Sequence, residues 1–547
     1  MMHSDFKPVV SRLDMRRLDE ATIRAGTKSI ELMERAGQHI ADFVRGHLDT
    51  LLPRARRGSG SPHVLVLAGP GNNGGDGFVA ARLLEARGAD VHVGLAADGW
   101  QVSVAACGKA PNPSSDAGIN CRRWRADGGT TIDVTRCQQQ LQQDKGGWDL
   151  AVDALFGTGL DRPLDAPFVE LISTLNASGT PLVAVDTPSG LCADSGRPLG
   201  IAVLADATVT LGAAKPGLFV GVGPNHTGHI AIADIGLVAP AVAGITPVGQ
   251  VIDDETCAMW VPHRHATTHK GDLGHVLVVG GAPGKTGAVL LAARGALRAG
   301  AGLVTMAVPR RLAATIDAAL PEAMTLALPE SDSGEIGDSA WDDLSYDVSR
   351  YTTAAIGPGI GTGAGASALV GAMVERFAGT LVIDADGLNV LAAERDRLCE
   401  RLRQRTERRF GAVVLTPHPG EMGRLTGTSS AEVQSNRLET VRAFSATHDA
   451  VLVLKGAATL VCDRQRTGFN SSGNPGMASP GMGDVLAGVT AALATRCADS
   501  FEAAALAVYV HGLAGDTLAA RLRGPGFLAG EVADAVPIAL AALSSGD

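Results

Sequence analysis

An alternation that recurs along this chain constrains its fold more than any other feature: a short apolar run, a glycine-rich polar loop, then an alanine-rich helical stretch. HVLVLA (63–68) is followed directly by GPGNNGGDG (69–77) and then by FVAARLLEARG. The same order returns at PLVAVDTPSG (181–190) and ATVTLGAAKPG (207–217), and a second series begins at HKGDLGHVLVVGG (269–281). Strands that alternate with helices in this way are typical of α/β proteins with mostly parallel, doubly wound sheets.

The composition fits this architecture. Glycine accounts for 69 of the 547 residues, hydrophobic residues for 45% and aromatic residues for only 4%. The core must therefore be built from Ala, Val and Leu with closely packed small residues, and glycine turns would join strands to helices. Because glycines after strands let backbone amides approach an anion, we expect the clusters at 69–77, 157–159, 280–287, 357–365 and 473–488 to mark ligand sites.

The alternation is interrupted once, at GLVAPAVAGITPVGQVIDDETCAMWVP (236–262), where prolines accumulate. This segment predicts a junction between two domains, residues 1–240 and residues 255–547. Within the first domain we expect one helix over 17–48, a polar loop over 54–62 and a strand at ADVHVGLAA (89–97). An irregular stretch follows, up to the next strand at DLAVDALFGTGL (149–160).

Charge and cysteine usage exclude several classes of protein. The formal net charge is −10 without a long acidic or basic run, which argues against nucleic-acid or membrane-surface binding. The eight cysteines include no C-x-x-C pair, so reduced cytosolic thiols are expected and a disulfide or zinc module is not. No apolar run marks a signal peptide or reaches the ~20 residues of a membrane span. We expect a soluble cytoplasmic homo-oligomer with small-molecule partners.

In the first half, polar residues follow several predicted strands. GPGNNG (69–74) satisfies G-x-G-x-x-G between a strand and a helix, and it is unusually polar. Because ligands bind at the carboxyl ends of parallel strands, Asn73, Asp153, Asp186 and Ser189 are expected to meet around one crevice. Their hard oxygen atoms suit an alkali or alkaline-earth cation. The alternatives are a purely structural turn for the glycines and helix N-capping for each aspartate.

Four motifs of this half, occurring in order, carry a resemblance: LMERAG (32–37), NNGGDG (72–77), DALFGTGL (153–160) and DTPSG (186–190). Together they resemble the NAD(P)H-hydrate epimerase domain. The resemblance implies a potassium ion bound by Asn73, Asp153 and Ser189, and Asp186 as the catalytic acid/base with Lys215 as a possible helper. It also implies that the substrate, a hydrated nicotinamide dinucleotide, contacts Asp186 and two loops: Asn72, Asn73, Gly74, Gly75 and Asp76, and Gly157, Thr158, Gly159, Leu160, Asp161, Arg162 and Pro163.

The second half contains a stronger signal than its apparent nucleotide motif. GGAPGKTGA (280–288) is not a P-loop, because the first glycine of that motif would fall on Val279. SPGMGDVLAG (479–488) instead places Asp484 at the start of a helix behind a glycine turn. The amides of such a turn can hold a phosphoryl group while the aspartate accepts a hydroxyl proton; the alternative for Asp484 is an ordinary N-cap. No second cluster of metal ligands accompanies His263, His265 and His269, so a polar linker is expected there.

The G-x-G-D pattern resembles the ribokinase-like fold. More narrowly, GPGIG (357–361), DADGLN (384–389), TPHPGE (416–421), KGAAT (455–459) and SPGMGD resemble the ADP/ATP-dependent NAD(P)H-hydrate dehydratase domain over about 269–540. The chain as a whole is thus similar to bifunctional nicotinamide-nucleotide repair enzymes, with a Rossmann-like domain before a ribokinase-like one. The implied residues are Asp484 as base, Ala288, Gly359, His418 and Asp484 against the hydrated dinucleotide, Lys455, Gly456, Ala457, Ala458, Thr459 and Gly483 against ADP, and Glu421 linked to magnesium.

The resemblance implies a repair reaction in two parts. The first domain would interconvert the R and S forms of hydrated NADH and NADPH, and the second would dehydrate the S form with ADP, which the residues alone do not distinguish from ATP. Three alternatives stay open. The first half could be an NAD-dependent dehydrogenase, the second half could be a small-molecule kinase that leaves a stable phosphorylated product, and either could bind nucleotides without turnover.

Overall fold

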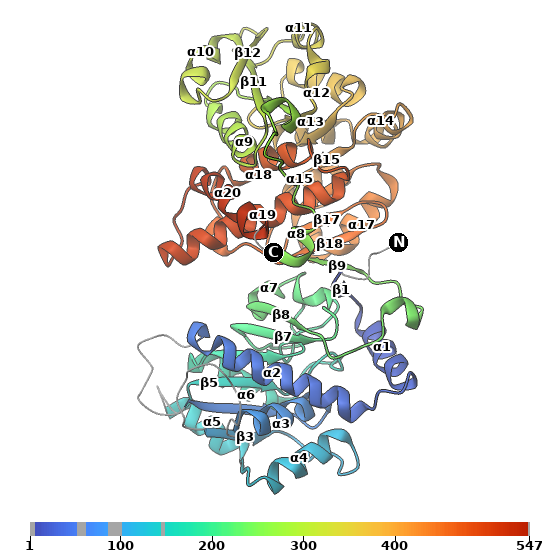
Figure 1. The fold of residues 1–547 in the computed structure, drawn as a ribbon, viewed down its shortest axis with the longest axis vertical. Helices are drawn as coiled ribbons and strands as arrows, with labels where there is room; N and C mark the ends of the chain where they lie inside the picture. Colours follow the sequence, from blue (N-terminus) through green and yellow to red (C-terminus); the bar gives the residue numbers. More distant parts are fainter. Residues whose placement is uncertain (1–5, 52–61, 86–100, 144–147, 545–547) are drawn as a thin grey trace. The chain divides into compact units, whose positions relative to one another are not determined.

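The chain forms two compact units, Met1–Gly249 and Gln250–Asp547, in a computed structural model that describes residues 6–51, 62–85, 101–143 and 148–544. The expected strand at 89–97 and nearly all of the expected loop at 54–62 lie outside the described residues. Both units are α/β and each is built on its own sheet, so the expected fold class, α/β with parallel sheets, is confirmed (Figure 1).

The sheet of the first unit is parallel throughout and runs in the order β4-β3-β2-β5-β6-β7-β8. Because the order reverses on either side of β2, the sheet has a topological switch point next to that strand, where doubly wound proteins bind ligands. The strands are β2 (His63–Ala68), β3 (Gln101–Ala106), β4 (Thr131–Ile132), β5 (Leu150–Ala154), β6 (Leu182–Val185), β7 (Ala207–Leu211) and β8 (His229–Ala233).

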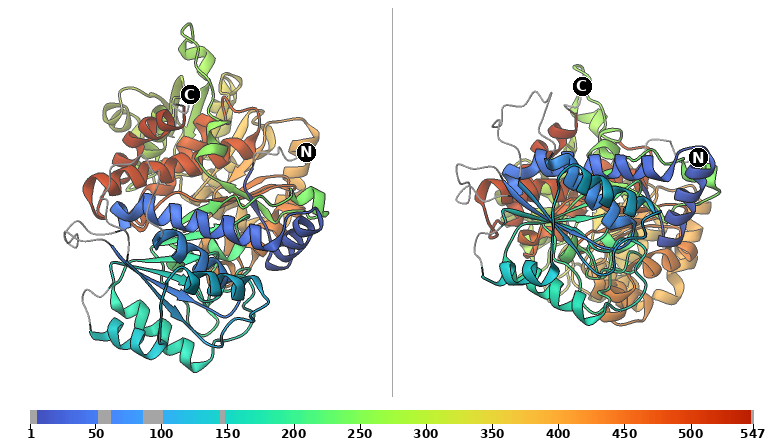
Figure 2. Two further views of the ribbon diagram at one scale, coloured as in Figure 1. Left: turned by 60° about the horizontal axis from the view of Figure 1, so that its bottom comes forward. Right: turned by 90° about the horizontal axis from the view of Figure 1, so that it is seen from below.

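Helices cover both faces of this sheet, as Figure 2 shows from two further directions. Successive strand residues point to opposite faces, so Val64 and Val66 pack under one set of helices while Leu65 and Leu67 pack under the other. The first face is covered by α2 (Ser29–Leu51), α3 (Asn72–Glu85) and α4 (Asp116–Ala126), and the second by α5 (Val134–Gln143) and α6 (Ala166–Ser178).

Two expectations for the first unit were wrong. The single helix expected over 17–48 is two helices, α1 (Arg12–Arg24) and α2, because the chain turns at Gly26 with φ of 112°. The stretch expected to be irregular contains β3, α4, β4 and α5. The remaining elements of this unit are β1 (Pro8–Val9), η2 (Pro216–Leu218), α7 (Pro224–Thr227) and η3 (Pro240–Ala243).

The sheet of the second unit runs β9-β18-β17-β16-β15-β14-β13-β10-β11-β12. The strands from β16 to β12 are parallel neighbours, and β16, β17 and β18 form an antiparallel meander. The strand–turn–strand expected at 454–461 is the β16–β17 hairpin. The strands are β9 (Gly249–Ile252), β10 (His275–Val279), β11 (Leu303–Pro309), β12 (Met324–Leu328), β13 (Thr353–Ile356), β14 (Thr380–Ile383), β15 (Val413–Leu415), β16 (Val451–Leu454), β17 (Leu460–Cys462) and β18 (Thr467–Asn470).

Small residues allow the central helices of this unit to pack closely. A Cβ on Gly488 of α18 would lie 1.8 Å from the carbonyl oxygen of Ala292 in α9, and one on Gly295 would lie 2.5 Å from that of Val485. This contact fixes the start of α18 relative to the sheet. The helices are α8 (Asp254–Ala258), η4 (Lys270–Leu273), α9 (Thr286–Arg298), α10 (Arg310–Ala319), α11 (Ala340–Ser345), η5 (Val348–Arg350), α12 (Ala364–Arg376), α13 (Asp386–Ala393), α14 (Arg395–Glu407), α15 (Pro419–Thr426), α16 (Ser430–Ser435), α17 (Arg437–Thr447), η6 (Pro475–Met477), α18 (Met482–Leu493), α19 (Ser500–Leu522) and α20 (Ala529–Ser544).

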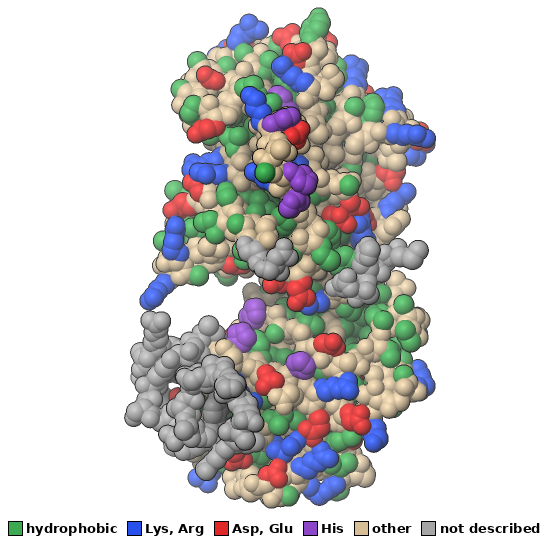
Figure 3. All heavy atoms as spheres, in the orientation of Figure 1, with side chains coloured by type: hydrophobic (Ala, Val, Ile, Leu, Met, Phe, Trp, Pro, Cys, Tyr) green, Lys and Arg blue, Asp and Glu red, His purple; other side chains and the backbone are tan. Residues whose placement is uncertain are grey.

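Helix α19 is long and apolar enough to cross a membrane. The sequence did not predict an apolar helix of this length. However, 72% of its most apolar 18-residue window is buried inside the unit, where it packs against α18 and α20. Its composition is therefore that of a core helix. On the face drawn in Figure 3, acidic and basic side chains are interspersed over both units.

Candidate functional sites

In the first unit, the expected residues gather where the strands β2, β5, β6 and β7 end. Asp186 directly follows β6 and adopts φ of 67°, a left-handed conformation that is costly for a residue with a side chain. Its carboxylate accepts an ion pair from Lys215, whose side chain is completely buried. Lys215 also donates to Thr210 Oγ1 at 3.0 Å and to the carbonyl oxygen of Leu211 at 3.1 Å. Lys215, which the resemblance named as a possible helper, is thus a buried partner of Asp186.

Asp153 and Ser189 form a second buried pair beside the first. Ser189 donates to Asp153 from its hydroxyl at 2.7 Å and from its backbone at 2.8 Å, and the amide of Leu155 donates at 3.2 Å. Both side chains are inaccessible to solvent. Burial raises the pKa of Asp153 to about 6, against the lowering effect of these hydrogen bonds. The hydrogen-bond partners of this carboxylate among the described residues are therefore all neutral donors.

Asn73 and Asp186 meet on either side of Gly157. A Cβ on Gly157 would lie 2.9 Å from Asn73 Oδ1 and 3.0 Å from Asp186 Oδ2. The side-chain amide nitrogen of Asn73 is buried and has no hydrogen-bond partner among the described residues. The amide of Thr158 donates to Asp186 Oδ2 at 3.3 Å, which ties the second expected substrate loop to the same carboxylate. An unpaired amide in this position is available to a ligand.

The glycines of NNGGDG are tightly packed, as the structural alternative for this turn expects. A Cβ on Gly74 would lie 1.9 Å from the carbonyl oxygen of Gly69, and one on Gly75 would lie 2.6 Å from the Met33 side chain. A Cβ on Gly77 would lie 2.6 Å from that of Ala154. Glycine is required at these positions because the start of α3 packs closely against other segments of the same unit.

Two further carboxyl groups belong to this cluster, and one of them was not predicted. Asp76 is 7% exposed, and its pKa is raised well above the usual value by burial and by the charges of Asp186 and Asp19. Asp19, on α1, has a pKa raised to about 6 by burial, an effect that Lys215 opposes and Asp186 reinforces. Helix α1 lies outside every motif, so only its packing reveals Asp19.

The rest of the second substrate loop points outward. Gly159, Asp161, Arg162 and Pro163 are exposed, as is Asn72 in the first loop. Asp161 forms an ion pair of 3.3 Å with Arg12 at the start of α1. The structure therefore brings together Asn73, Asp76, Gly157, Thr158 and Asp186, and it leaves the outer part of the loop at the surface, tied to α1.

In the second unit, the site is organised around Lys455 at the end of β16. Its ammonium group lies 2.5 Å from Asp384 Oδ1 and 3.8 Å from Glu421 Oε2. Asp384 is 1% exposed and also accepts from Thr416 Oγ1 at 2.8 Å. Although burial lowers the pKa of Lys455, Asp384 and Glu421 raise it above its usual value. Asp384 was quoted within DADGLN but given no role by the sequence.

Asp484 lies in the first turn of α18, near Lys455. The helix begins after Gly481, which adopts φ of 89° and would place a Cβ 2.6 Å from the side chain of Leu291. A Cβ on Gly483 would lie 3.0 Å from Lys455 Nζ, so the helix N-terminus directly adjoins the ammonium group. Burial raises the pKa of Asp484 to about 6, as does the charge of Asp384, while Lys455 lowers it. Asp484 is thus poised to exchange a proton near neutral pH.

His418 supports Glu421 through a reciprocal cap at the start of α15. The amide of Gly420 donates to His418 Nδ1 at 3.0 Å, and the amide of His418 donates to Glu421 Oε2 at 2.8 Å. His418 Nε2 lies 3.4 Å from Glu421 Oε1. Burial lowers the pKa of His418, as do the charges of Lys455 and Arg424, whereas burial raises the pKa of Glu421 to about 7. Half of the His418 side chain remains exposed to a ligand.

A second aspartate that sequence reasoning missed joins two of the expected loops. Asp386 accepts from Lys285 Nζ at 2.9 Å and from the amide of Gly361 at 3.0 Å. A Cβ on Gly359 would lie 3.2 Å from that of Ala288. The expected substrate contacts Ala288 and Gly359 are therefore direct neighbours, and the lysine of the rejected P-loop has a partner within the protein.

The turn of the β16–β17 hairpin contains the expected nucleotide residues. Gly456 and Ala457 are exposed, while Ala458 adopts φ of 46° and Gly456 φ of 142°. Thr459 is buried and donates to the carbonyl oxygen of Gly456 at 3.0 Å. Arg437 donates to the carbonyl oxygens of Leu454 and Lys455, which holds the hairpin in place from behind.

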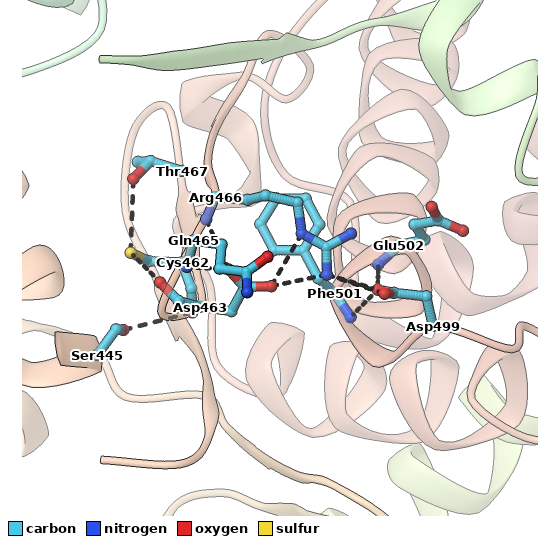
Figure 4. A network of polar contacts seen from close by, with 9 residues as sticks. All are labelled: Ser445, Cys462, Asp463, Gln465, Arg466, Thr467, Asp499, Phe501 and Glu502. Atoms are coloured by element: carbon cyan, nitrogen blue, oxygen red, sulfur yellow. Dashed lines mark hydrogen bonds and ion pairs between the residues drawn. The ribbon is translucent and has the colours of Figure 1, made fainter. Parts of the chain in front are cut away.

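A cavity of about 410 Å³ lies at the opposite edge of this sheet, where β15 and β16 begin. Its rim includes the network of Figure 4, in which Arg466 binds Asp463 and Asp499 and stacks 4.3 Å from the ring centroid of Phe501. Arg464, also at the cavity, pairs with Asp449 at 3.0 Å. Because these arginines already have carboxylate partners, the network stabilises the β17–β18 turn and is distinct from the expected site.

Among the described residues, no group of three His, Cys, Asp or Glu side chains could hold a metal ion. A divalent cation in the second unit would therefore depend on one or two carboxylates and on phosphate oxygens from a nucleotide. In the first unit, the expected ligands Asn73, Asp153 and Ser189 present oxygen atoms and a single carboxylate, a donor set that suits a monovalent ion.

Comparison with known proteins places both halves in described families. Residues 29–217 match the family described as YjeF-related protein N-terminus, and residues 276–537 match the family described as NAD(P)H-hydrate dehydratase. The bifunctional NAD(P)H-hydrate repair enzyme Nnr of Moorella thermoacetica is 39% identical over 97% of this chain and 96% of its own length. The protein of the same name from Escherichia coli is 36% identical over 94% of this chain and 90% of its own.

A solved structure is similar to the second unit. The ADP/ATP-dependent NAD(P)H-hydrate dehydratase of Bacillus subtilis, co-crystallized with ATP/Mg2+, is 28% identical and covers 54% of this chain and 99% of its own, with a TM-score of 0.46.

Proposed function

Because the chain belongs to the family of bifunctional NAD(P)H-hydrate repair enzymes, we propose that it repairs hydrated NADH and NADPH in two steps. The first unit interconverts the R and S forms of the hydrate. The second unit dehydrates the S form with ADP, which yields AMP and phosphate. The observation that carries the second step is the buried Lys455–Asp384 pair, which adjoins the N-terminus of α18 one residue before Asp484.

The chemistry of dehydration explains why a nucleotide is needed. Hydration removes a ring double bond, and the hydroxide that must leave is a poor leaving group. Transfer of the terminal phosphoryl group of ADP to the ring hydroxyl makes a good leaving group, which the ring nitrogen can expel. Asp484 accepts the hydroxyl proton, and the amides at Gly481–Gly483 stabilise the transferring group at the helix N-terminus.

The nucleotide is proposed to lie along the β16–β17 hairpin, against Lys455, Gly456, Ala457, Ala458, Thr459 and Gly483. Because Lys455 is already paired with Asp384, its ammonium group is fixed in position and would attract phosphate oxygens. A carboxylate such as Glu421, whose Oε2 lies 3.8 Å from Lys455 Nζ, would help to hold magnesium. Bound magnesium would neutralise charge that develops on the phosphates.

In the first unit, Asp186 is proposed to exchange protons with the substrate, which would lie against the loops Asn72–Asp76 and Gly157–Pro163. Potassium would be held by Asn73, Asp153 and Ser189. Support for the cation comes from the complete burial of the Asp153 carboxylate, whose hydrogen-bond partners among the described residues are neutral donors. The unpaired amide of Asn73 beside Asp186 is available to the substrate.

The experiment that tests this function uses hydrated NADH as a mixture of epimers, with and without ADP. We expect absorbance of reduced nicotinamide to return only with ADP, and both epimers to be consumed. Asp484→Asn should abolish dehydration and leave epimerisation intact, while Asp396→Asn, at a position whose side chain is 98% exposed, serves as the matched control. Full dehydration by Asp484→Asn would contradict the assignment, and a stable phosphorylated product would indicate a kinase instead.

A further inference from the structure

A buried cation lies behind the proposed nucleotide hairpin of the second unit. Arg437, the first residue of α17, is 2% exposed, and the acceptors of its hydrogen bonds in the described part of the chain are neutral oxygens. Burial lowers its pKa to about 10, so the guanidinium group is still charged at neutral pH. Because a buried charge without a counter-charge is costly, an anion nearby would be stabilised.

The guanidinium group fixes the peptide that joins Leu454 to Lys455. Its Nη2 donates to the carbonyl oxygen of Leu454 at 2.9 Å. On the other side of the same peptide, the amide of Lys455 donates to the carbonyl oxygen of Pro417 at 2.9 Å. The peptide is therefore held from both sides, by α17 and by the segment after β15. This fixes the backbone of Lys455, whose ammonium group lies 2.5 Å from Asp384 Oδ1.

The next peptide is held from one side only. Arg437 Nη1 donates to the carbonyl oxygen of Lys455 at 3.1 Å. The N–H group of a trans peptide points away from its C=O group, and no peptide bond in the described residues is cis, so the amide of Gly456 points away from Arg437. Among the described residues, neither this amide nor that of Ala457 has a hydrogen-bond acceptor, and both residues are exposed. Free amides on an exposed turn suit an anion.

Gly456 allows the guanidinium group to approach this turn. A Cβ at this position would lie 2.7 Å from Arg437 Nη1, and the φ angle of 142° is one that residues with side chains rarely adopt. The positive charge thus lies directly against the turn, whose outer side carries the free amides of Gly456 and Ala457. Charge and amides together would attract a phosphate group to this turn.

Resting on the dehydratase activity proposed above, we propose that Arg437 is a positioning residue for the nucleotide. By holding the carbonyl oxygen of Lys455, it directs the amide of Gly456 toward the phosphate group that ADP retains when it becomes AMP. With the transferred phosphoryl group at Gly481–Gly483, next to Lys455 Nζ, the retained phosphate comes to lie at the hairpin turn. Arg437 acts through the backbone and does not contact the reacting atoms.

AMP and adenosine differ by the phosphate group in question. The complete chain would dehydrate hydrated NADH with ADP and magnesium, followed by reduced-nicotinamide absorbance, in the presence of AMP or adenosine as inhibitor. We expect AMP to inhibit more strongly than adenosine, and Arg437→Met to reduce this preference roughly tenfold or more, whereas kcat at saturating ADP falls much less. A preference that Arg437→Met leaves unchanged would overturn the proposal, and absence of ADP-dependent dehydration by the unchanged protein would refute the proposed function instead.

Two further variants separate orientation from charge. Arg437→Lys keeps the charge but lacks the planar fork that reaches two carbonyl oxygens, so it should show the same loss of preference as Arg437→Met. Gly456→Ala should show this loss as well, because the new Cβ would displace the guanidinium group. A full preference for AMP in Arg437→Lys would overturn the orienting role.

Arg442→Gln is the matched control, since Arg442 is an exposed arginine of the same helix. It should leave the preference for AMP over adenosine and the KM for ADP as in the unchanged protein. If Arg437→Met loses kcat at saturating ADP because it folds poorly, Gly456→Ala decides, since it leaves the arginine in the chain. A loss confined to AMP would support the proposal, whereas an equal loss for AMP and adenosine would indicate a merely structural role and overturn it.

Discussion

The pH dependence of dehydration follows directly from the surroundings of Asp484. Its pKa is raised to about 6 by burial and by the charge of Asp384, with Asp386 adding and Lys455 opposing. If its carboxylate is the base, the active fraction is about nine-tenths at pH 7 and about one-tenth at pH 5, so kcat/KM for the hydrate should fall about tenfold. An aspartate with an ordinary pKa would remain almost fully ionised over this range.

The fall in kcat/KM toward low pH, the acid limb of the pH profile, is measured by following AMP release at saturating ADP. Glu421 lies near the same lysine and has a pKa raised by burial to about 7, so it titrates close to Asp484. Glu421→Gln should therefore keep the acid limb near pH 6, although magnesium dependence can change. Asp386→Asn removes a negative charge near Asp484. Because that charge raises the pKa of Asp484, the acid limb should move to lower pH. A kcat/KM that is constant down to about pH 5 would refute the role of Asp484 as the base.

Four further changes have expected outcomes. Gly157→Ala should abolish epimerisation and spare dehydration, because its Cβ would lie 3.0 Å or less from Asn73 and Asp186; an active variant with bound substrate would contradict this. Lys455→Met should raise the KM for ADP at least tenfold, as measured by AMP release, with epimerisation as the internal control. Replacement of potassium by a bulky organic cation should slow epimerisation alone, and Ser189→Ala should reduce the remaining potassium dependence.

The sequence predicted the sites best where a residue directly follows a strand. Asp186 and Lys455 directly follow strands, and Asp153 is the last residue but one of its strand. Each could be assigned to the carboxyl edge of its own sheet because parallel strands align their carboxyl ends. The same rule could have found Asp384, which follows β14 in LVIDADG. Asp19 could not be found in this way, because it lies on a helix and its place near Lys215 depends on how α1 packs.

The excess of glycine was interpreted only partly correctly. Gly74, Gly77 and Gly488 leave no room for a Cβ because another part of the protein already occupies it. Gly71, by contrast, faces open space within 4 Å of its Cβ position and remains free for a ligand. A glycine pattern in a sequence does not distinguish these two uses, since close packing and ligand approach both require the absence of a side chain.

The two sites solve the same electrostatic problem with the same local geometry. In each, a lysine binds an aspartate that directly follows a parallel strand: the fully buried Lys215 with Asp186, and the partly buried Lys455 with Asp384. In each, a residue at this position adopts a left-handed conformation despite its side chain, Asp186 itself and Ala385 after Asp384. Such strain persists only where the surroundings enforce it. Each unit also holds a further acid, Asp76 in the first and Asp484 in the second, whose pKa is raised by burial.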